Sequence, residues 1–274
     1  MFLLECRLIG RSTTNRAIAA AVFVVFVAPS LWTASGMTGS SEVATFVTLE
    51  EGHTVSAAYW FLGIDIYVVF LPLLAFLFGY GTIATERDEG TLSILGSLPV
   101  TRFDIYIGKA LARVLVFMGV SFVGVLAGSF GLVITTSVAA VSFSHLLGAV
   151  WSALFSAALV SIAVTLSALL SSRLHALSGA IAGYFGLVFG AVWTLGIAPI
   201  AIVGHPFHGY SVLIAGVFDT MYPSLEITLS SGSQSAETLL WVVTAPVAVL
   251  VLFVWVCCPL AVGYLGFRNE VFLS

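Results

Sequence analysis

The sequence predicts an all-α, polytopic membrane protein. Only 8% of its 274 residues are charged and 60% are hydrophobic, whereas charged residues make up about 25% of an ordinary soluble domain. Apolar runs recur along the chain, each of about 20 residues, which is the length a helix needs to cross a lipid bilayer. The runs are uniformly apolar, unlike the alternating strands of a membrane barrel. One membrane domain, residues 1–274, accounts for the chain.

Six apolar runs predict six membrane-spanning helices. In chain order they cover residues 17–34, 59–84, 110–136, 146–170, 177–203 and 239–267. The first run follows a segment of mixed polarity with several arginines, and no small-residue cleavage site comes after it. We therefore interpret it as an uncleaved anchor.

The basic residues predict the orientation of these spans. Every Lys and Arg lies before the first span, between the second and third, between the fourth and fifth, at an inner end, or after the sixth: Arg7, Arg11, Arg16, Arg87, Arg102, Lys109, Arg113, Arg173 and Arg268. The expected outer loops, 35–58, 137–145 and 204–238, contain none. The positive-inside rule therefore places both termini in the cytoplasm. We expect the protein to lie in the cell (plasma) membrane.

The segment after the second span is expected to start two helices. Thr85 followed by Asp88, and Thr101 followed by Asp104, fit the spacing of a capping box, in which a Thr and an acidic residue three positions later satisfy the first amide groups of a helix. Pro99 separates the two. We therefore predict a short cytoplasmic helix and then a second helix that runs on into the third span.

The short helix has an amphipathic pattern with two possible uses. Its leucines recur at three-residue steps, at Leu92, Leu95 and Leu98. They could lie in the membrane surface or form a ridge that docks into a groove of a cytoplasmic partner. A helix on anionic lipid is usually basic. This segment carries net negative charge from Glu86, Asp88 and Glu89, which favours a protein partner.

Three basic residues mark the start of the second helix. Lys109 and Arg113 are four residues apart, so they share one helix face. We expect them, together with Arg102, to anchor the inner membrane boundary at the depth of the lipid phosphates.

The run TERDEGTLSILGSLPVTRFDIYIGK resembles the cytoplasmic segment after the second span of ABC transporter type-2 permeases, especially the copper-processing branch of nitrous oxide reductase maturation. That segment typically reads E-x-E-x-G-T-L, a few apolar residues, L-P-x-[ST]-R and then G-K. Asp88 stands where the family has a glutamate. The N-terminal run LLECRLIGRSTTNR resembles the family's interfacial elbow helix. The matching positions are Glu86, Gly90, Thr91, Leu92, Leu98, Pro99, Arg102, Gly108 and Lys109.

The resemblance implies a permease subunit that pairs with a second permease copy and with two cytoplasmic ABC ATPase subunits. It implies that ATP hydrolysis drives export, or conformational work on an extracytoplasmic partner. In the family the helix after the second span is the coupling helix. Carried over by position, its partner-binding residues are Glu86, Asp88, Glu89, Gly90, Thr91, Leu92, Leu95, Leu98 and Pro99.

ATP and Mg are expected in the partner ATPase, because the chain lacks the phosphate-binding motif G-x-x-x-x-G-K-[ST]. The pair Gly108-Lys109 does not complete this motif, because it lies at a helix start and is followed by Ala110 and not by Ser or Thr. We predict no cofactor, no catalytic residue and no nucleic-acid partner for the chain itself.

Two other functional classes are alternatives to a transporter subunit. An intramembrane enzyme needs paired catalytic groups at one depth, yet Asp65 is the only acid clearly inside a predicted span and no His lies in one. An assembly or maturation factor without solute transport fits the same sequence features as a transporter.

Asp65 is the candidate for a solute path, because an acid within a span usually faces a cavity or the bundle interior. The alternative places it in water at the membrane interface. His205 and His208 could suggest a metal, but Pro206 separates them and no Cys or Met cluster joins them, so we predict no metal site.

Glycines at intervals of three or four residues are expected to let helices approach closely. They lie in the third span, at Gly124 and Gly128, and in the fifth, at Gly179, Gly183, Gly186 and Gly190. We expect packing within one subunit; the alternative for the fifth span is a dimer seam.

Overall fold

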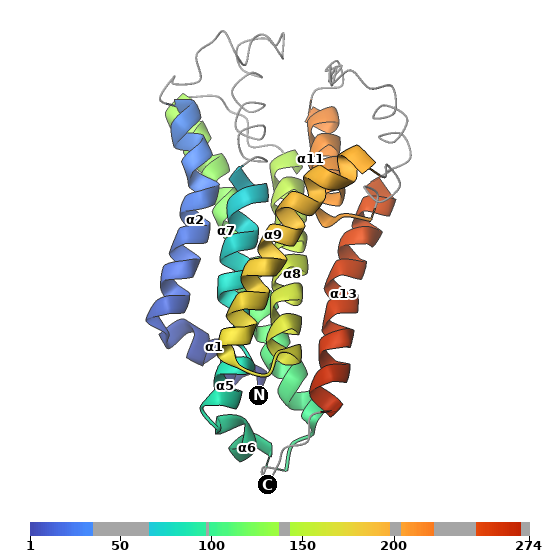
Figure 1. Ribbon diagram of the computed structural model, residues 1–274. Helices are drawn as coiled ribbons and strands as arrows, with labels where there is room; N and C mark the ends of the chain where they lie inside the picture. The colour runs from blue at the N-terminus through green and yellow to red at the C-terminus, as the bar shows by residue number, and fades with distance from the viewer. Residues whose placement is uncertain (35–65, 97–98, 137–142, 198–203, 222–244, 270–274) are drawn as a thin grey trace.

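The computed structural model describes residues 1–34, 66–96, 99–136, 143–197, 204–221 and 245–269, and these form a helical bundle (Figure 1). The second expected span corresponds to Ile66–Asp88, which is helical over 66–79 and turns over 80–83. The other helices are α1 (Phe2–Arg11), α2 (Thr13–Ala34), α5 (Ala84–Asp88), α6 (Thr91–Gly96), α7 (Arg102–Thr136), α8 (Phe143–Leu169), α9 (Arg173–Ile197), α11 (Pro206–Met221) and α13 (Ala245–Asn269).

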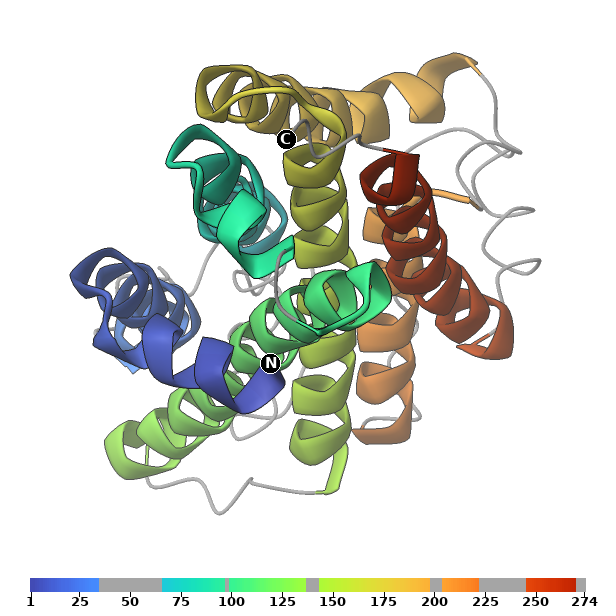
Figure 2. The same ribbon diagram turned by 90° about the horizontal axis from the view of Figure 1, so that it is seen from below.

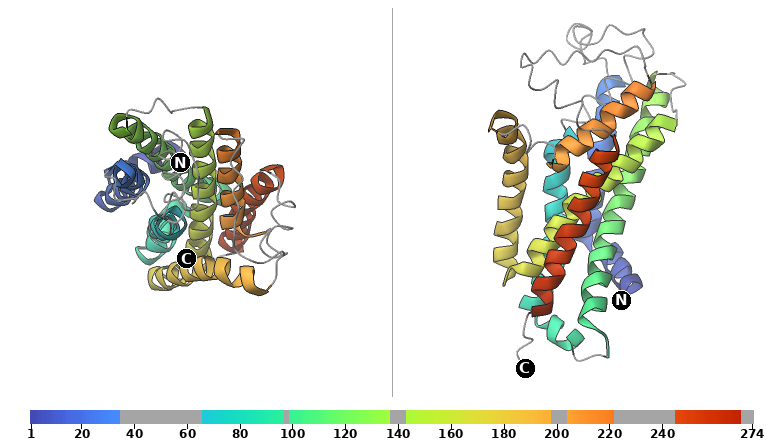
Figure 3. Two further views of the ribbon diagram at one scale, coloured as in Figure 1. Left: turned by 90° about the horizontal axis from the view of Figure 1, so that it is seen from above. Right: turned by 90° about the vertical axis from the view of Figure 1, so that its right-hand side faces the viewer.

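The membrane class is confirmed by five helices long and apolar enough to cross a bilayer in the described residues. They are Thr13–Leu31, Ile66–Asp88, Arg102–Gly131, His145–Leu169 and Ala245–Asn269. The expected span at 177–203 corresponds to α9, which runs beside the bundle (Figure 3) and ends at Ile197. Six spans therefore stay a prediction. The amino end of the chain and the carboxyl end of α13 lie at the same end of the bundle (Figure 1).

One capping box is present as predicted, and it starts the longest helix. The backbone N–H of Asp104 donates to Thr101 Oγ1 at 3.1 Å, and the N–H of Thr101 donates to Asp104 Oδ2 at 3.2 Å. These bonds satisfy amide groups that have no partner inside the helix. From there α7 continues for 35 residues, which confirms that the second predicted helix and the third span are one element.

α8 is the central helix, with the other helices arranged around it when the bundle is seen from below (Figure 2). It packs against α7, α9, α11 and α13. Its small side chains allow this close approach. Some of its hydroxyls bond carbonyls one turn earlier, since Ser161 donates to Ala157 at 2.7 Å and Thr165 to Ser161 at 2.8 Å. The fully buried members of this small-residue surface are Ala149, Ser152, Ser156, Ala158, Ser161, Ala163 and Ser167.

The expected outer loop 204–238 contains a helix that the sequence analysis did not predict. α11 is 16 residues long, about 24 Å at 1.5 Å per residue, which is too short for the length rule used to find spans. Its Tyr210 ring stacks on Phe155 of α8 at 4.5 Å, and the Tyr210 hydroxyl lies 2.9 Å from Ser152 Oγ. Burial of this aromatic face explains why the segment is helical.

The glycines of the third and fifth spans pack partly within the subunit, as expected. A Cβ on Gly124 would lie 2.9 Å from Phe26 of α2, and one on Gly183 would lie 3.0 Å from Phe76 of the second span. A Cβ on Gly186 would meet nothing within 4 Å. The described structure therefore explains Gly124 and Gly183 by packing and leaves Gly186 on an open face.

Gly79 makes a close backbone approach between the second span and α8, which gives a testable prediction. A Cβ there would lie 2.5 Å from Ala163 Cβ and 3.3 Å from the Ala163 backbone, so Gly79→Ala forces the helices apart. We expect a loss of about 1–3 kcal/mol, typical of overpacking, measured as a lower Tm in detergent. Gly119→Ala is the matched control, because nothing lies within 4 Å of its added methyl group; equal Tm values for the two variants would contradict the packing.

Candidate functional site

Residues 84–96, which include the last turn of the second span, form two short helices at one end of the bundle, where a single amphipathic helix was predicted. α5 ends at Asp88 and α6 begins at Thr91. Between them Gly90 has φ of 73°, a left-handed conformation that costs other residues about 1–2 kcal/mol. The left-handed turn at Gly90 therefore breaks the helix, and the leucine pattern alone could not show this.

The start of α5 is capped by another helix and not by Thr85 as predicted. The cap position is Ile83, and Thr85 lies inside the helix. The Ser167 hydroxyl of α8 accepts hydrogen bonds from the backbone N–H groups of Ile83 at 2.9 Å and Ala84 at 3.1 Å. A residue more than eighty positions away thus does what a local N-cap usually does.

Arg87 holds the carboxyl end of α8. Its guanidinium donates to the carbonyl oxygens of Leu170 and Ala168, the latter at 3.1 Å. The last carbonyls of a helix have no partner inside it and carry partial negative charge. The Arg87 cation is therefore well suited to this helix end.

Asp88 holds the amino end of α9. Its Oδ2 accepts a hydrogen bond from the backbone N–H of Arg173, the first residue of α9, at 2.7 Å. A carboxylate at this place satisfies a free amide and interacts favourably with the positive end of the helix dipole.

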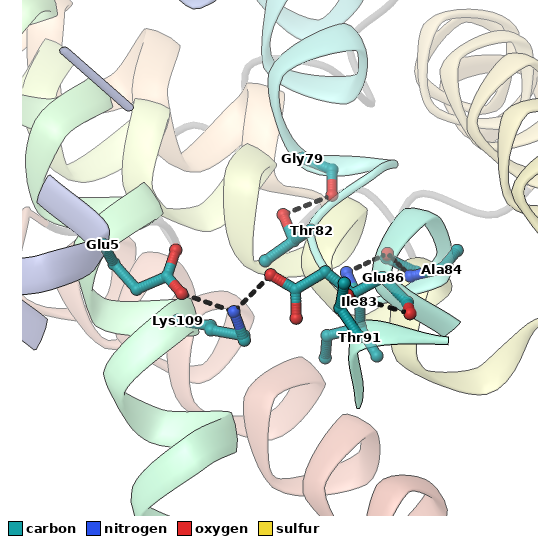
Figure 4. Close-up of polar contacts among 9 residues, drawn as sticks. Glu5, Gly79, Thr82, Ile83, Ala84, Glu86, Thr91 and Lys109 are labelled. Carbon is teal, nitrogen blue, oxygen red and sulfur yellow. Dashed lines mark hydrogen bonds and ion pairs between the residues drawn. The ribbon is translucent and has the colours of Figure 1, made fainter. Parts of the chain in front are cut away.

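Glu86 belongs to a buried ion-pair cluster (Figure 4). The Lys109 ammonium lies 2.5 Å from Glu86 Oε1 and also pairs with Glu5 of α1. The place of Lys109 at the depth of the inner membrane boundary stays a prediction. Its side chain is 1% exposed, so it is enclosed by protein. The reason is electrostatic, because two carboxylates converge on this position and compensate for the loss of water around the cation.

Arg113 balances the charge of this cluster. Its guanidinium donates to Asn15 Oδ1 at 3.1 Å and to the Phe78 carbonyl at 2.9 Å, and lies over the Phe78 ring. With Lys109 it gives two cations for the two carboxylates of Glu5 and Glu86. Arg113 therefore binds protein groups, and its place at the depth of the inner membrane boundary also stays a prediction.

We call the three consecutive residues Glu86, Arg87 and Asp88 the charged joint. Each contacts a different helix: Glu86 the Lys109 of α7, Arg87 the end of α8 and Asp88 the start of α9. Through Lys109 the joint also reaches Glu5 of α1. A rigid movement of α5 would therefore strain contacts to four helices at once.

The predicted leucine ridge is only partly available to a partner. Leu92 is 3% exposed and packs in the core, and Leu95 is partly buried against it; Leu98 lies outside the described residues. The break at Gly90 turns α6 so that Ile94, 66% exposed, points outward.

The remaining predicted partner-binding residues divide between the surface and internal contacts. Glu89 and Pro99 are exposed. The Thr91 hydroxyl donates to the Glu86 carbonyl at 3.2 Å (Figure 4), which ties α6 back to α5. Arg102 is exposed and donates to the Arg268 carbonyl of α13 at 2.8 Å, so it caps a helix end in addition to its expected place at the boundary.

Asp65, the candidate for a solute path, lies outside the described residues. His205 and His208 have ring centroids 5.8 Å apart. Burial, and secondarily the neighbouring His208, lower the pKa of His205 to about 4, so this ring is neutral near pH 7. In the described part of the chain, no group of three or more His, Cys, Asp or Glu side chains is placed to hold a metal ion.

Sequence analysis missed Glu5, Arg87 and Ser167 as parts of the site. Glu5 carried one signal, since it is the single acid in an N-terminal segment that is otherwise basic. Ser167 carried none, because a serine in an apolar helix usually bonds its own backbone.

Comparison with known families gives one match. A family model described as ABC-2 family transporter protein matches residues 11–270, almost the whole chain. No curated protein matches the sequence. The copper-processing branch suggested by the sequence is not tested by this match.

The buried pairing of Lys109 can be tested by removing the cation. Lys109→Met leaves two carboxylates facing each other without a partner, and breaking a buried ion pair in this way costs about 3–5 kcal/mol. We expect a correspondingly large fall in Tm. The control replaces the whole cluster, with Glu5→Gln and Glu86→Gln added to Lys109→Met, and should recover much of the stability. An unchanged Tm in the single variant would show that Lys109 is not enclosed by Glu5 and Glu86.

The long-range cap can be tested at Ser167. Ser167→Ala removes the acceptor of two amide groups, at Ile83 and Ala84, and an unsatisfied buried donor costs about 1–3 kcal/mol. We expect faster hydrogen exchange at these two amides and a lower Tm. Ser161→Ala is the control, since its hydroxyl donates to a carbonyl of its own helix; the same exchange rates at residues 83 and 84 in both variants would argue against the cap.

Proposed function

The chain belongs to the ABC-2 family of transporter proteins, and from that premise we propose that it is the permease subunit through which a separate cytoplasmic ATPase drives a membrane domain. As a family member it is a multi-pass membrane subunit of an ABC transporter and not a nucleotide-binding domain. Members of this family normally pair with a cytoplasmic ABC ATPase. ATP and Mg belong to that ATPase in the proposal.

The charged joint is the observation that carries the proposal. A subunit that is moved by a partner needs a segment that is exposed on one side and fixed to the membrane helices on the other. Residues 84–96 have this arrangement, because Glu89 and Ile94 are exposed while Glu86, Arg87 and Asp88 contact α7, α8 and α9.

The proposed mechanism is mechanical. Nucleotide-driven closure of the ATPase displaces α5 and α6, and the charged joint passes this displacement to three membrane helices. The joint contacts are hydrogen bonds and ion pairs of 2.5–3.1 Å, whose energy falls steeply with misalignment. The helices therefore follow the segment, since lagging behind would break these contacts.

The whole transporter in this proposal has two permease copies and two ATPases, with the charged joint and both termini in the cytoplasm and six spans in each permease. Its output is export or conformational work on an extracytoplasmic partner. The distribution of Lys and Arg supports the orientation, and the exposed apolar surfaces of the bundle, such as Phe185 and Phe189 of α9, leave room for lipid and a second copy.

The docking surface can be tested at Ile94. Ile94→Asp should weaken copurification with the ATPase, because truncating a central apolar anchor commonly costs about 2 kcal/mol, roughly thirty-fold in Kd, and a buried charge adds to this. The control is Leu3→Asp, an exposed leucine at the same end of the bundle but on α1. Equal retention of the ATPase by both variants would refute docking through α6.

A further inference from the structure

The carboxyl-terminal half of α9 contacts the residue that precedes α11. The His205 ring bonds the backbone of Leu187, and a Cβ on Gly190 would lie 3.9 Å from His205 Nε2. In the same half of α9, Phe185 and Phe189 are 49% and 55% exposed, so this helix has one face toward the bundle and one open face. His205 therefore bridges α9 to the start of α11.

The hydrogen bonds of His205 require a neutral ring. The backbone N–H of Phe207 donates to Nδ1 at 3.3 Å, so Nδ1 is an acceptor and carries no proton. The proton of the neutral ring is then on Nε2, the nitrogen on the side of α9, where it donates to the Leu187 carbonyl. A second proton, on Nδ1, would set one N–H donor against the N–H of Phe207.

The segment around His205 is itself fixed to other helices. The Trp255 indole of α13 donates to the Gly204 carbonyl at 2.7 Å. On the other side, the Phe207 ring lies 5.5 Å from Phe155 of α8. Since residues 204–207 are held by α8 and α13, the imidazole of His205 connects α9 to an anchored segment.

His208 is the titratable neighbour of His205, and neither ring has a counter-ion in the described part of the chain. The two ring centroids are 5.8 Å apart, and His208 Nε2 is buried without a hydrogen-bond partner among the described residues. Burial lowers the pKa of both rings, and His208 lowers the pKa of His205 further, to about 4. The groups that the packed helices turn toward this segment are uncharged: Leu187 and Gly190 of α9, Phe155 of α8 and Trp255 of α13.

We propose that His205 and His208 form a proton-operated latch, in which the neutral pair holds α9 against the start of α11 and protonation of the pair releases α9. The latch lies toward the end of the bundle away from α1 and α5 (Figure 1), so acid on that side of the membrane operates it. The inference does not rest on the proposed function, since all of its contacts lie within one chain.

Protonation favours the released state because that state binds protons more tightly. A histidine in water has a pKa of about 6.5, whereas the pKa of His205 in the closed latch is about 4. The stabilisation is therefore complete above about pH 6.5 and is lost as the pH falls toward about 4. Between about pH 7.5 and about pH 5, His205 alone lowers the ratio of closed to released latch about thirty-fold.

The latch and the charged joint act on opposite ends of one helix. Asp88 bonds the N–H of Arg173 at the amino end of α9, and His205 bonds Leu187 in its other half. Release at His205 therefore frees α9 from α11 while its amino end stays bonded to α5.

The experiment measures the distance between α9 and α13 in the full chain, in phosphatidylcholine vesicles without ATPase. Spin labels are attached at Phe189→Cys and Leu250→Cys, two exposed positions, in a background whose native cysteines are serine. Pulsed electron resonance gives the distance distribution at about pH 7.5 and about pH 5. We expect a narrow population at the higher pH and a second, broader one at the lower pH, with the ratio of second to first rising about thirty-fold.

Histidine variants then assign the response to the latch. His205→Gln keeps an amide donor for the Leu187 carbonyl but has no titrating ring, so the narrow population should persist in acid. His208→Gln removes the like charge beside His205 and should give a smaller rise than the native pair. The matched control, His175→Gln, removes an exposed imidazole at the other end of α9 and should leave the full response.

Three outcomes would overturn the proposal. These are the same distance distribution at both pH values in the native pair, a full acid response in the His205→Gln variant, and a response in the His208→Gln variant as large as that of the native pair. The second would indicate that acid acts on α9 through a titratable group outside the latch.

Discussion

The structure depends on one buried ammonium group, that of Lys109, held between Glu5 and Glu86. A charge enclosed in a membrane protein is stable only when opposite charges surround it closely. This requirement fixes three elements relative to one another, because the carboxylates come from α1 and from the end of the second span while the cation comes from α7. Arg113 brings the cluster to neutrality from the next turn of α7, where it also bonds Phe78.

The other contacts of the charged joint involve helix ends, where backbone N–H and C=O groups have no partner inside the helix. α8 finishes with unsatisfied carbonyls and α9 starts with unsatisfied amides, and the turn between them lies beside α5. Arg87 and Asp88 satisfy the two ends with side chains of opposite sign, each matched to the local helix dipole. Ser167 of α8 in turn caps the start of α5, because its hydroxyl accepts hydrogen bonds from the backbone N–H groups of Ile83 and Ala84. The joint therefore has a structural role in the single subunit and is also suited to transmit a displacement.

The same arrangement decides what remains on the surface. Since Glu86, Arg87 and Asp88 are bonded to other helices and Leu92 is buried, the side chains of 84–96 that a partner can reach without breaking these contacts include Glu89 and Ile94. Since Glu5 is also engaged, the surface of α1 becomes basic and apolar. One cluster thus produces an acidic and apolar surface at α5 and α6 and a separate basic surface at α1.

The sequence by itself determined the membrane class, because apolar runs of helical length have no other stable environment, and it determined the start of α7, because the bonds between Thr101 and Asp104 are local. It also indicated that residues 86–99 matter, from their motif. Only the tertiary structure decided that Gly90 breaks the predicted helix, that Leu92 faces the core, that Lys109 is buried and that α11 is a packed helix. The break at Gly90 is a matter of local backbone conformation, but several of the other features depend on partners distant in sequence: Ser167 for the cap of α5, Glu5 for Lys109 and Phe155 for Tyr210. Periodicity and capping patterns report on neighbours along the chain, whereas burial and charge pairing depend on which helices meet in space.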